Sequence, residues 1–107
     1  MDARTQLIIS EFKRASQSLY GSRLNRIVLF GSYARNEHHD DSDIDFMVVL
    51  NDAAITRLDE INRFLPVQSA LSLKHNITIS VLPVSYKKYS QSTLPVYHFA
   101  RLEGITV

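Results

Sequence analysis

The 107-residue sequence has no cysteine, no long apolar run and no strong excess of charge of either sign. Without cysteine it can form neither a disulfide nor a thiolate metal site. Its apolar runs are far shorter than the ~20 residues that a membrane-spanning helix needs. The first five residues lack the basic and then apolar pattern of a signal peptide. We therefore expect a cytoplasmic protein that makes no contact with a membrane.

The formal net charge is only +1, with 12 Lys and Arg against 11 Asp and Glu. A protein this close to neutrality lacks the strongly basic surface that grips a nucleic-acid backbone. We expect no nucleic-acid partner, although a single nucleotide remains a possible ligand. The hydrophobic content of 45% and charged content of 21% are ordinary for a globular protein. The length predicts that residues 1–107 form a single domain.

The predicted secondary structure alternates helices with short apolar strands. We expect Pro66 to interrupt a long central helix and Pro83 to end the third strand, because proline has no N–H donor. The order of elements predicts an α+β (α/β two-layer) fold, a small mixed sheet with flanking helices. The expected elements are a helix at 2–20, strands at 26–30, 43–50 and 77–82, helical segments at 53–65 and 66–76, a turn at 85–90, a helix at 94–103 and an edge strand at 105–107.

The first expected strand ends in Gly31-Ser32, and a short helix begins there. Gly31 permits a tight turn, and Ser32 is placed to cap a helix that starts at Tyr33. Such a turn directs backbone N–H groups and the positive end of a helix dipole outward, which favours phosphate binding. Arg35 lies three residues after Ser32 and is a candidate to contact a phosphate or an aspartate. A surface ion pair is an equally good interpretation of Arg35.

Two aspartates, Asp43 and Asp45, stand at the start of the second strand, where aspartate is normally rare. Residues two apart in a strand point to the same face, so the carboxylates repel each other unless a cation lies between them. Mg²⁺ accepts carboxylate oxygens and keeps positions for water and phosphate. The alternative interpretation is that Gly31-Ser32 is an ordinary turn and that both aspartates are solvated carboxylates on an edge strand. The order and spacing of the two motifs favour a phosphate-binding turn that faces a metal-binding pair.

Gly31-Ser32, the ten residues that follow and Asp43-Ile44-Asp45 resemble the signature of the DNA polymerase beta-like nucleotidyltransferase superfamily. More narrowly, they resemble its minimal nucleotidyltransferases (MNT), the antitoxin halves of HEPN–MNT toxin–antitoxin pairs. Residues 94–105 are similar to the usual MNT ending. The resemblance spans 24–107 and implies a palm-like nucleotidyltransferase fold. It also implies Mg²⁺, ATP or another nucleoside triphosphate as substrate, and AMP transfer to a tyrosine of a HEPN-type toxin.

One feature departs from the superfamily, in which a third carboxylate usually lies on the next strand. Ser80, or less well Thr78, occupies the expected position, and no acidic residue occurs between Glu60 and Glu103. A serine hydroxyl binds Mg²⁺ weakly and accepts no proton at neutral pH. Two hypotheses therefore remain: an enzyme with two carboxylates, and a weakened or inactive MNT protein that neutralises its partner by binding alone.

Two further groups of side chains invite a functional interpretation. The loop at 36–41 carries adjacent histidines and aspartates, but adjacent residues on a loop seldom converge on one metal ion, and we favour a solvated loop. The edge of the third strand and four aromatic side chains offer a possible homodimer face, although burial in the core is the favoured interpretation. These aromatic residues are Tyr86, Tyr89, Tyr97 and Phe99.

Overall fold

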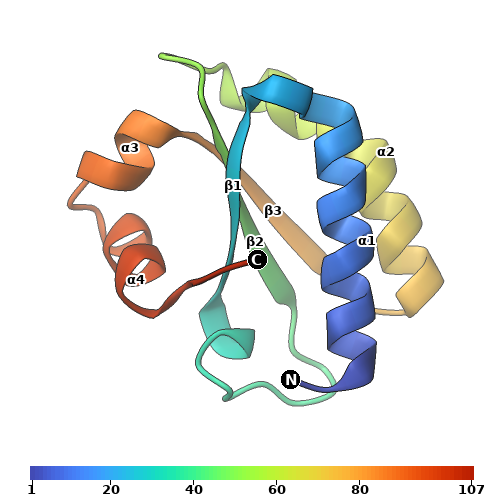
Figure 1. Ribbon diagram of the computed structural model, residues 1–107. Coiled ribbons are helices and arrows are strands. Elements are labelled where there is room, and N and C mark those ends of the chain that lie inside the picture. Colours follow the sequence, from blue (N-terminus) through green and yellow to red (C-terminus); the bar gives the residue numbers. More distant parts are fainter.

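A four-stranded sheet between helices forms the framework of the computed structural model, which describes all residues from 1 to 107 (Figure 1). The elements are α1 (Ala3–Tyr20), β1 (Leu24–Phe30), β2 (Ile44–Leu50), α2 (Arg57–His75), β3 (Ile79–Ser85), α3 (Tyr86–Gln91), α4 (Pro95–Glu103) and β4 (Ile105–Thr106), with short 3₁₀ helices at Gly21–Arg23 and Gly31–Tyr33. The strand order is β3-β2-β1-β4. Strand β1 is antiparallel to β2 and β4, whereas β2 and β3 are parallel. The predicted α+β fold with a mixed sheet is confirmed.

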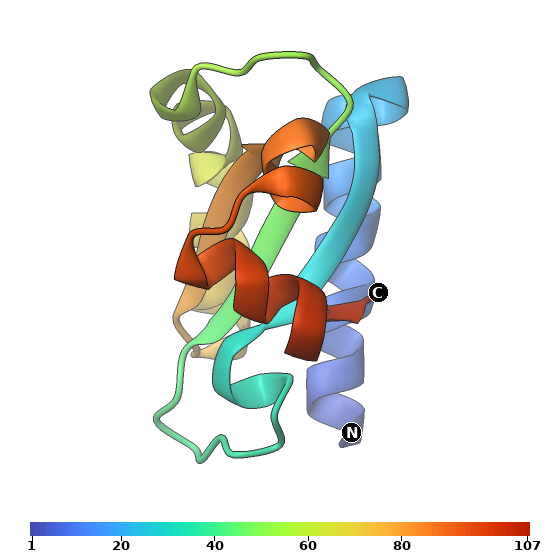
Figure 2. The ribbon, with the colours of Figure 1, turned by 90° about the vertical axis from the view of Figure 1, so that its left-hand side faces the viewer.

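The helices form a layer on each face of the sheet. Helices α1 and α2 cover one face, and α3 and α4 cover the other (Figure 1). Figure 2 looks at the second face, where α4 crosses in front of the sheet and the 3₁₀ helix at Gly31–Tyr33 lies below it. None of the helices combines the length and the apolar character needed to cross a membrane.

Strand β2 is the centre of the core, as its apolar sequence predicts. All its residues from 46 to 50 are fully buried. Because side chains alternate between the two faces of a strand, Phe46 and Val48 pack with α1 and α2, whereas Met47 and Val49 pack with α3 and α4. Asp45 has the same parity as Met47, so its side chain belongs to the face covered by α3 and α4.

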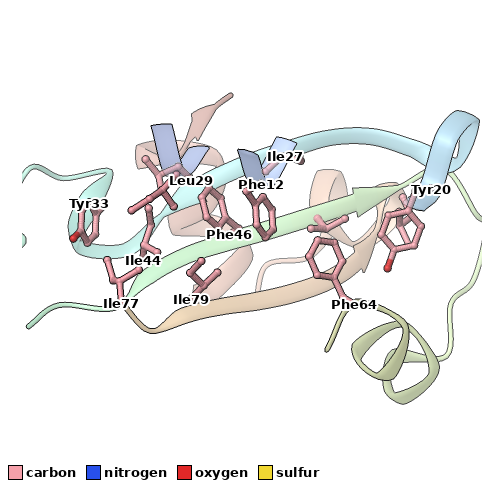
Figure 3. Close-up of a cluster of buried hydrophobic side chains, with 13 residues drawn as sticks. Phe12, Tyr20, Ile27, Leu29, Tyr33, Ile44, Phe46, Phe64, Ile77 and Ile79 are labelled. Atoms are coloured by element: carbon pink, nitrogen blue, oxygen red, sulfur yellow. The ribbon is translucent and has the colours of Figure 1, made fainter. Parts of the chain in front are cut away.

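Three stacked aromatic rings fasten α1 and α2 to the sheet (Figure 3). The ring of Phe12 in α1 lies 3.9 Å from that of Phe46 in β2 and 5.1 Å from that of Phe64 in α2, measured between centroids. All three side chains are fully buried. Stacked rings contribute beyond the area they bury. This cluster therefore holds β2 in place from the side opposite Asp45.

The predicted break at Pro66 is wrong, because α2 continues through this residue as one helix. Phe64 before it and Val67 after it pack against the same core, and this packing outweighs the local cost of about 3 kcal/mol for an internal proline. Pro66 cannot donate to the carbonyl of Asn62, four residues earlier. Both residues are exposed, so water can hydrogen-bond to this carbonyl instead. The helix also starts at Arg57 instead of residue 53, and Ile55 packs against the core from the preceding loop.

The predicted end of the third strand is also wrong, because β3 includes Pro83 and continues to Ser85. Strand β3 lies at the edge of the sheet and pairs only with β2, so a missing N–H on its free side breaks no ladder bond. The other elements agree with prediction to within two residues at their ends.

The four aromatic side chains near the edge of the sheet divide into two pairs. Tyr89 and Tyr97 are buried between the sheet and the helices above it, as predicted. Tyr86 and Phe99 are 42% and 50% exposed, so the core prediction is wrong for these two. Each lies on the outer side of its helix, where tertiary packing leaves it without a covering element.

We predict that Phe12→Ala lowers the free energy of unfolding by about 3–5 kcal/mol, because it leaves a cavity between α1, β2 and α2. Urea denaturation followed by circular dichroism measures the change. Leu73→Ala is the matched control: Leu73 is 86% exposed on α2, and its loss should change stability by less than about 0.5 kcal/mol. Equal losses in both variants would contradict the central position of Phe12.

Candidate active site

The turn after β1 begins at Gly31, which adopts a φ of +73° that L-amino acids rarely accept. The N–H groups of Ala34 and Arg35 both donate to the carbonyl of Gly31, at 3.1 and 3.2 Å. Ser32 lies inside this 3₁₀ helix and caps nothing, so the predicted capping role is wrong. The helix starts one residue earlier than expected because glycine itself makes the turn. The first N–H groups of such a helix have no partner within it and remain available to a ligand.

Gly31 packs directly against the carboxylate of Asp45. The antiparallel register pairs Phe30 with Asp45. Gly31, the first residue after β1, therefore lies over the aspartate side chain. A Cβ atom on Gly31 would overlap with Oδ2 of Asp45. Glycine is therefore required here for two reasons, its positive φ and the close approach of its backbone to a charged group.

The two aspartates differ in their surroundings. Asp43 is exposed just before β2, whereas Asp45 is half-buried on the strand. Burial raises the pKa of Asp45 above its ordinary value, and the negative charge of Asp43 raises this pKa further. The hydroxyl of Ser80 and the positive charge of Arg35 act in the opposite direction and lower it. Repulsion between the two carboxylates, expected from their spacing, is thus present in the folded chain, and a cation bound between them would relieve it.

Ser80 stands beside Asp45 on the neighbouring strand. The parallel register of β2 and β3 pairs these two residues, which is the position that the sequence predicts for the missing third carboxylate. No group of three or more His, Cys, Asp or Glu side chains converges anywhere in the structure, the loop at 36–41 included. Two carboxylates with open positions around them fit Mg²⁺, which binds one or two protein carboxylates and keeps water and phosphate as its other ligands.

Arg35 lies at the rim of the site, where its exposed guanidinium contacts two carboxylates. It is 3.1 Å from Glu37 and 3.7 Å from Glu103. Exposed pairs of this kind contribute little to stability. Arg35 therefore makes the surface ion pairs considered as one of its roles, while its charge also influences Asp45. A phosphate group could replace either carboxylate at little cost.

A cavity of about 450 Å³ opens beside Gly31, between the turn and α4. Sequence reasoning missed the contribution of α4, whose apolar residues were assigned to the core. The only signal was the position of Phe99 two residues after the buried Tyr97, which places the two side chains on different sides of a helix. The lining residues are Phe30, Gly31, Arg35, Val96, Phe99 and Glu103.

Comparisons with known proteins agree with this geometry. A family model described as a nucleotidyltransferase domain matches residues 9–94. Two proteins of Methanocaldococcus jannaschii that are named as protein adenylyltransferases are similar in sequence. One is 37% identical over 81 residues, which cover 76% of this chain and 78% of the relative. The other is 30% identical over 95 residues, which cover 89% of this chain and 88% of the relative.

Solved structures share the fold. The crystal structure of a toxin–antitoxin with AMP-PNP matches with a TM-score of 0.64 at 16% identity, over 91% of this chain and 69% of that chain. The structure of a minimal nucleotidyltransferase matches with a TM-score of 0.59 at 22% identity, over 100% of this chain and 97% of that chain. At these identities the likeness shows the fold alone.

We predict that Asp45→Asn raises the free energy of unfolding at pH 7 when a chelator is present. A carboxyl whose pKa is raised by folding stabilises the protein below its ordinary pKa of about 3.9 and loses this contribution as the pH rises through the folded-state pKa. The gain in the variant should therefore disappear near pH 3. Urea denaturation at both pH values measures it.

The exposed Asp41 provides the matched control for this experiment. Asp41→Asn removes the same charge from the loop and should leave stability almost unchanged at either pH. An Asp45→Asn variant that is less stable than the natural chain at pH 7 would contradict the prediction.

Proposed function

This chain belongs to the nucleotidyltransferase domain family, and we propose that it transfers AMP from ATP to a hydroxyl group of a partner protein, with Mg²⁺ as the metal. The observation that supports the proposal is the contact between the Gly31 backbone and the Asp45 carboxylate, since a turn suited to phosphate and a carboxylate suited to Mg²⁺ are then neighbours. The names of the two sequence relatives support a protein acceptor and an adenylyl group.

In this proposal the turn holds the triphosphate. The backbone N–H groups of Gly31 and Ser32 and the Ser32 hydroxyl contact the β- and γ-phosphates, because the start of a helical turn attracts anions. Arg35 exchanges one of its exposed carboxylate partners for a phosphate oxygen. Asp43 and Asp45 hold Mg²⁺, which when bound neutralises charge on the triphosphate.

The acceptor hydroxyl oxygen attacks the α-phosphorus of ATP. A bond forms between these two atoms, the bond from the α-phosphorus to the bridging oxygen breaks, and pyrophosphate leaves with the electron pair. Residues of the chain contribute mainly by positioning and by charge stabilisation. The proton of the hydroxyl passes to solvent water, because β3 has Ser80 and no carboxylate at the position that could accept it. The loss of a general base typically costs about 10²–10⁴-fold in rate, so we expect slow turnover.

We propose a tyrosine of a HEPN-type toxin as the acceptor, which makes this chain the antitoxin of a pair. Solved toxin–antitoxin structures share its fold, which supports a partner of this kind. The cavity between Gly31 and α4 also supports it, since apolar Val96 and Phe99 in its wall suit an incoming aromatic ring. Ser80 favours a second candidate, an inactive chain that neutralises its partner by binding alone.

A direct test incubates the chain with Mg²⁺, ATP and a HEPN-type protein encoded next to it, and follows the mass of that protein. We expect the partner to gain the mass of one AMP. The variant with both Asp43→Asn and Asp45→Asn should abolish the gain, because it removes both metal ligands. Partner neutralisation that persists in this variant without any mass gain would favour the binding-only candidate.

The two glycines with positive φ provide a matched pair of variants for the same assay. Gly21→Ala and Gly31→Ala both place a side chain in the left-handed region, yet only Gly31 has a carboxylate where the new Cβ would lie. The positive φ should cost both variants about 1 kcal/mol of stability, and Gly31→Ala should lose more because its Cβ also displaces Asp45. Gly31→Ala alone should lower AMP transfer, by about tenfold or more, since it displaces Asp45. Equal effects on transfer would contradict the role given to Gly31.

We further predict that Ser80→Asp increases turnover, because it supplies the third carboxylate next to Asp45. The expected gain is about 100-fold, at the lower end of what a general base contributes. Ser80→Asn is the control for size and polarity without the charge, and it should give no gain. The rate of AMP transfer at saturating Mg²⁺ and ATP measures both. A Ser80→Asp variant no faster than the natural chain would show that a missing carboxylate does not limit the rate.

A further inference from the structure

A second cavity lies at the end of the sheet opposite the two aspartates. It has a volume of about 680 Å³ and is enclosed by residues 53–57, the last residues of β3, helix α3 and Tyr97 of α4. Asp45 and Ser80 stand near the beginning of β2 and β3, whereas this cavity lies beside residues 83–85. The five positions from Ser80 to Ser85 correspond to about 16 Å along a strand. Figure 2 shows the 3₁₀ helix of the active site and helix α3 at opposite ends of this face.

The charge that lines this cavity is entirely positive. Arg57, Lys87 and Lys88 contribute to its wall, and no Asp or Glu does. None of these three cations takes part in an ion pair. Arg57 has a single side-chain partner, the hydroxyl of Tyr97 at 3.4 Å. Three unpaired cations around one cavity, in a chain of net charge +1, favour a multiply charged anion over a single carboxylate.

The remaining wall suits the uncharged part of a ligand. Ala53, Ala54 and Ile55 provide apolar surface, while Gln91 and Ser92 add an amide and a hydroxyl. The volume is within the range of small-molecule sites, which combine mostly apolar walls with a few polar groups. A carboxylate side chain of a protein would use only a fraction of this space and one of the three cations.

We propose that this cavity binds a nucleoside polyphosphate, at a second site separate from the two aspartates. Arg57, Lys87 and Lys88 contact the phosphates, and the nucleoside packs against Ala54 and Ile55. Because no carboxylate lines the cavity, binding needs no metal ion to bridge the ligand to the protein. This independence from metal distinguishes it from the proposed active site, where Asp43 and Asp45 hold Mg²⁺.

Calorimetric titration of ATP into the chain in the presence of EDTA tests the proposal. The protein carries Asp43→Asn and Asp45→Asn, which together with EDTA remove metal-dependent binding of ATP at the proposed active site. We expect one ATP to bind per chain. Adding Arg57→Ser and Lys88→Ser should weaken binding by at least about tenfold, because two charge-assisted contacts are lost. Absence of ATP binding in EDTA overturns the second site and leaves the proposed function untouched.

A control pair separates a specific site from general attraction of an anion. Lys13→Ser and Arg14→Ser remove the same charge from the exposed side of α1, away from the cavity, and should leave ATP affinity unchanged. An equal loss in this pair overturns the proposal. Circular dichroism checks that all variants remain folded.

Two probes distinguish the contribution of the phosphates to the binding affinity from that of the nucleoside. Inorganic tripolyphosphate should bind more weakly than ATP but lose affinity in the Arg57→Ser, Lys88→Ser variant, and adenosine should bind more weakly still. Tripolyphosphate that binds as tightly as ATP overturns the nucleoside part and assigns the cavity to polyphosphate alone. Adenosine that binds as tightly as ATP overturns the role of the three cations.

Discussion

The contact between the Gly31 backbone and the Asp45 carboxylate is the constraint on which the candidate active site depends. It follows from the pairing of Phe30 with Asp45 across β1 and β2, because this register sets the turn over the aspartate. Burial of Asp45 and the negative charge of Asp43 raise the pKa of Asp45, so the two carboxylates repel each other in the folded chain. Such a site is prepared for a cation and for the phosphates that accompany it.

Strand β2 serves both the core and the site because its side chains alternate between two faces. Phe46 is fixed by the ring of Phe12 on one face, and this rigid support holds Asp45 on the other. The parallel neighbour β3 then places Ser80 beside Asp45. The sheet of this nucleotidyltransferase domain therefore brings Asp45 and Ser80 together on neighbouring strands.

Helix α4 contributes to both cavities on the face of the sheet that α3 and α4 cover. Val96 and Phe99 border the cavity at Gly31, whereas Tyr97 on the other side of the helix borders the basic cavity near α3. Phe99 is half exposed for this reason, although its sequence context resembles that of a core residue. The burial of Tyr97 and Ala100 against the sheet holds the helix between the two cavities.

The sequence alone determined the features that depend on neighbouring residues along the chain. The apolar run of β2, the turn at Gly31 and the serine at position 80 are local features, and the structure places β2 in the core, the turn after β1 and Ser80 beside Asp45, as expected. Only the tertiary structure decided where a residue departs from its local conformational preference. Pro66 stays within α2 because its neighbours pack on one core, and Pro83 stays within β3 because that strand has a free edge. The basic cavity joins Arg57, Lys87 and Lys88 from separate segments, and such proximity is set by chain packing, which no local pattern encodes.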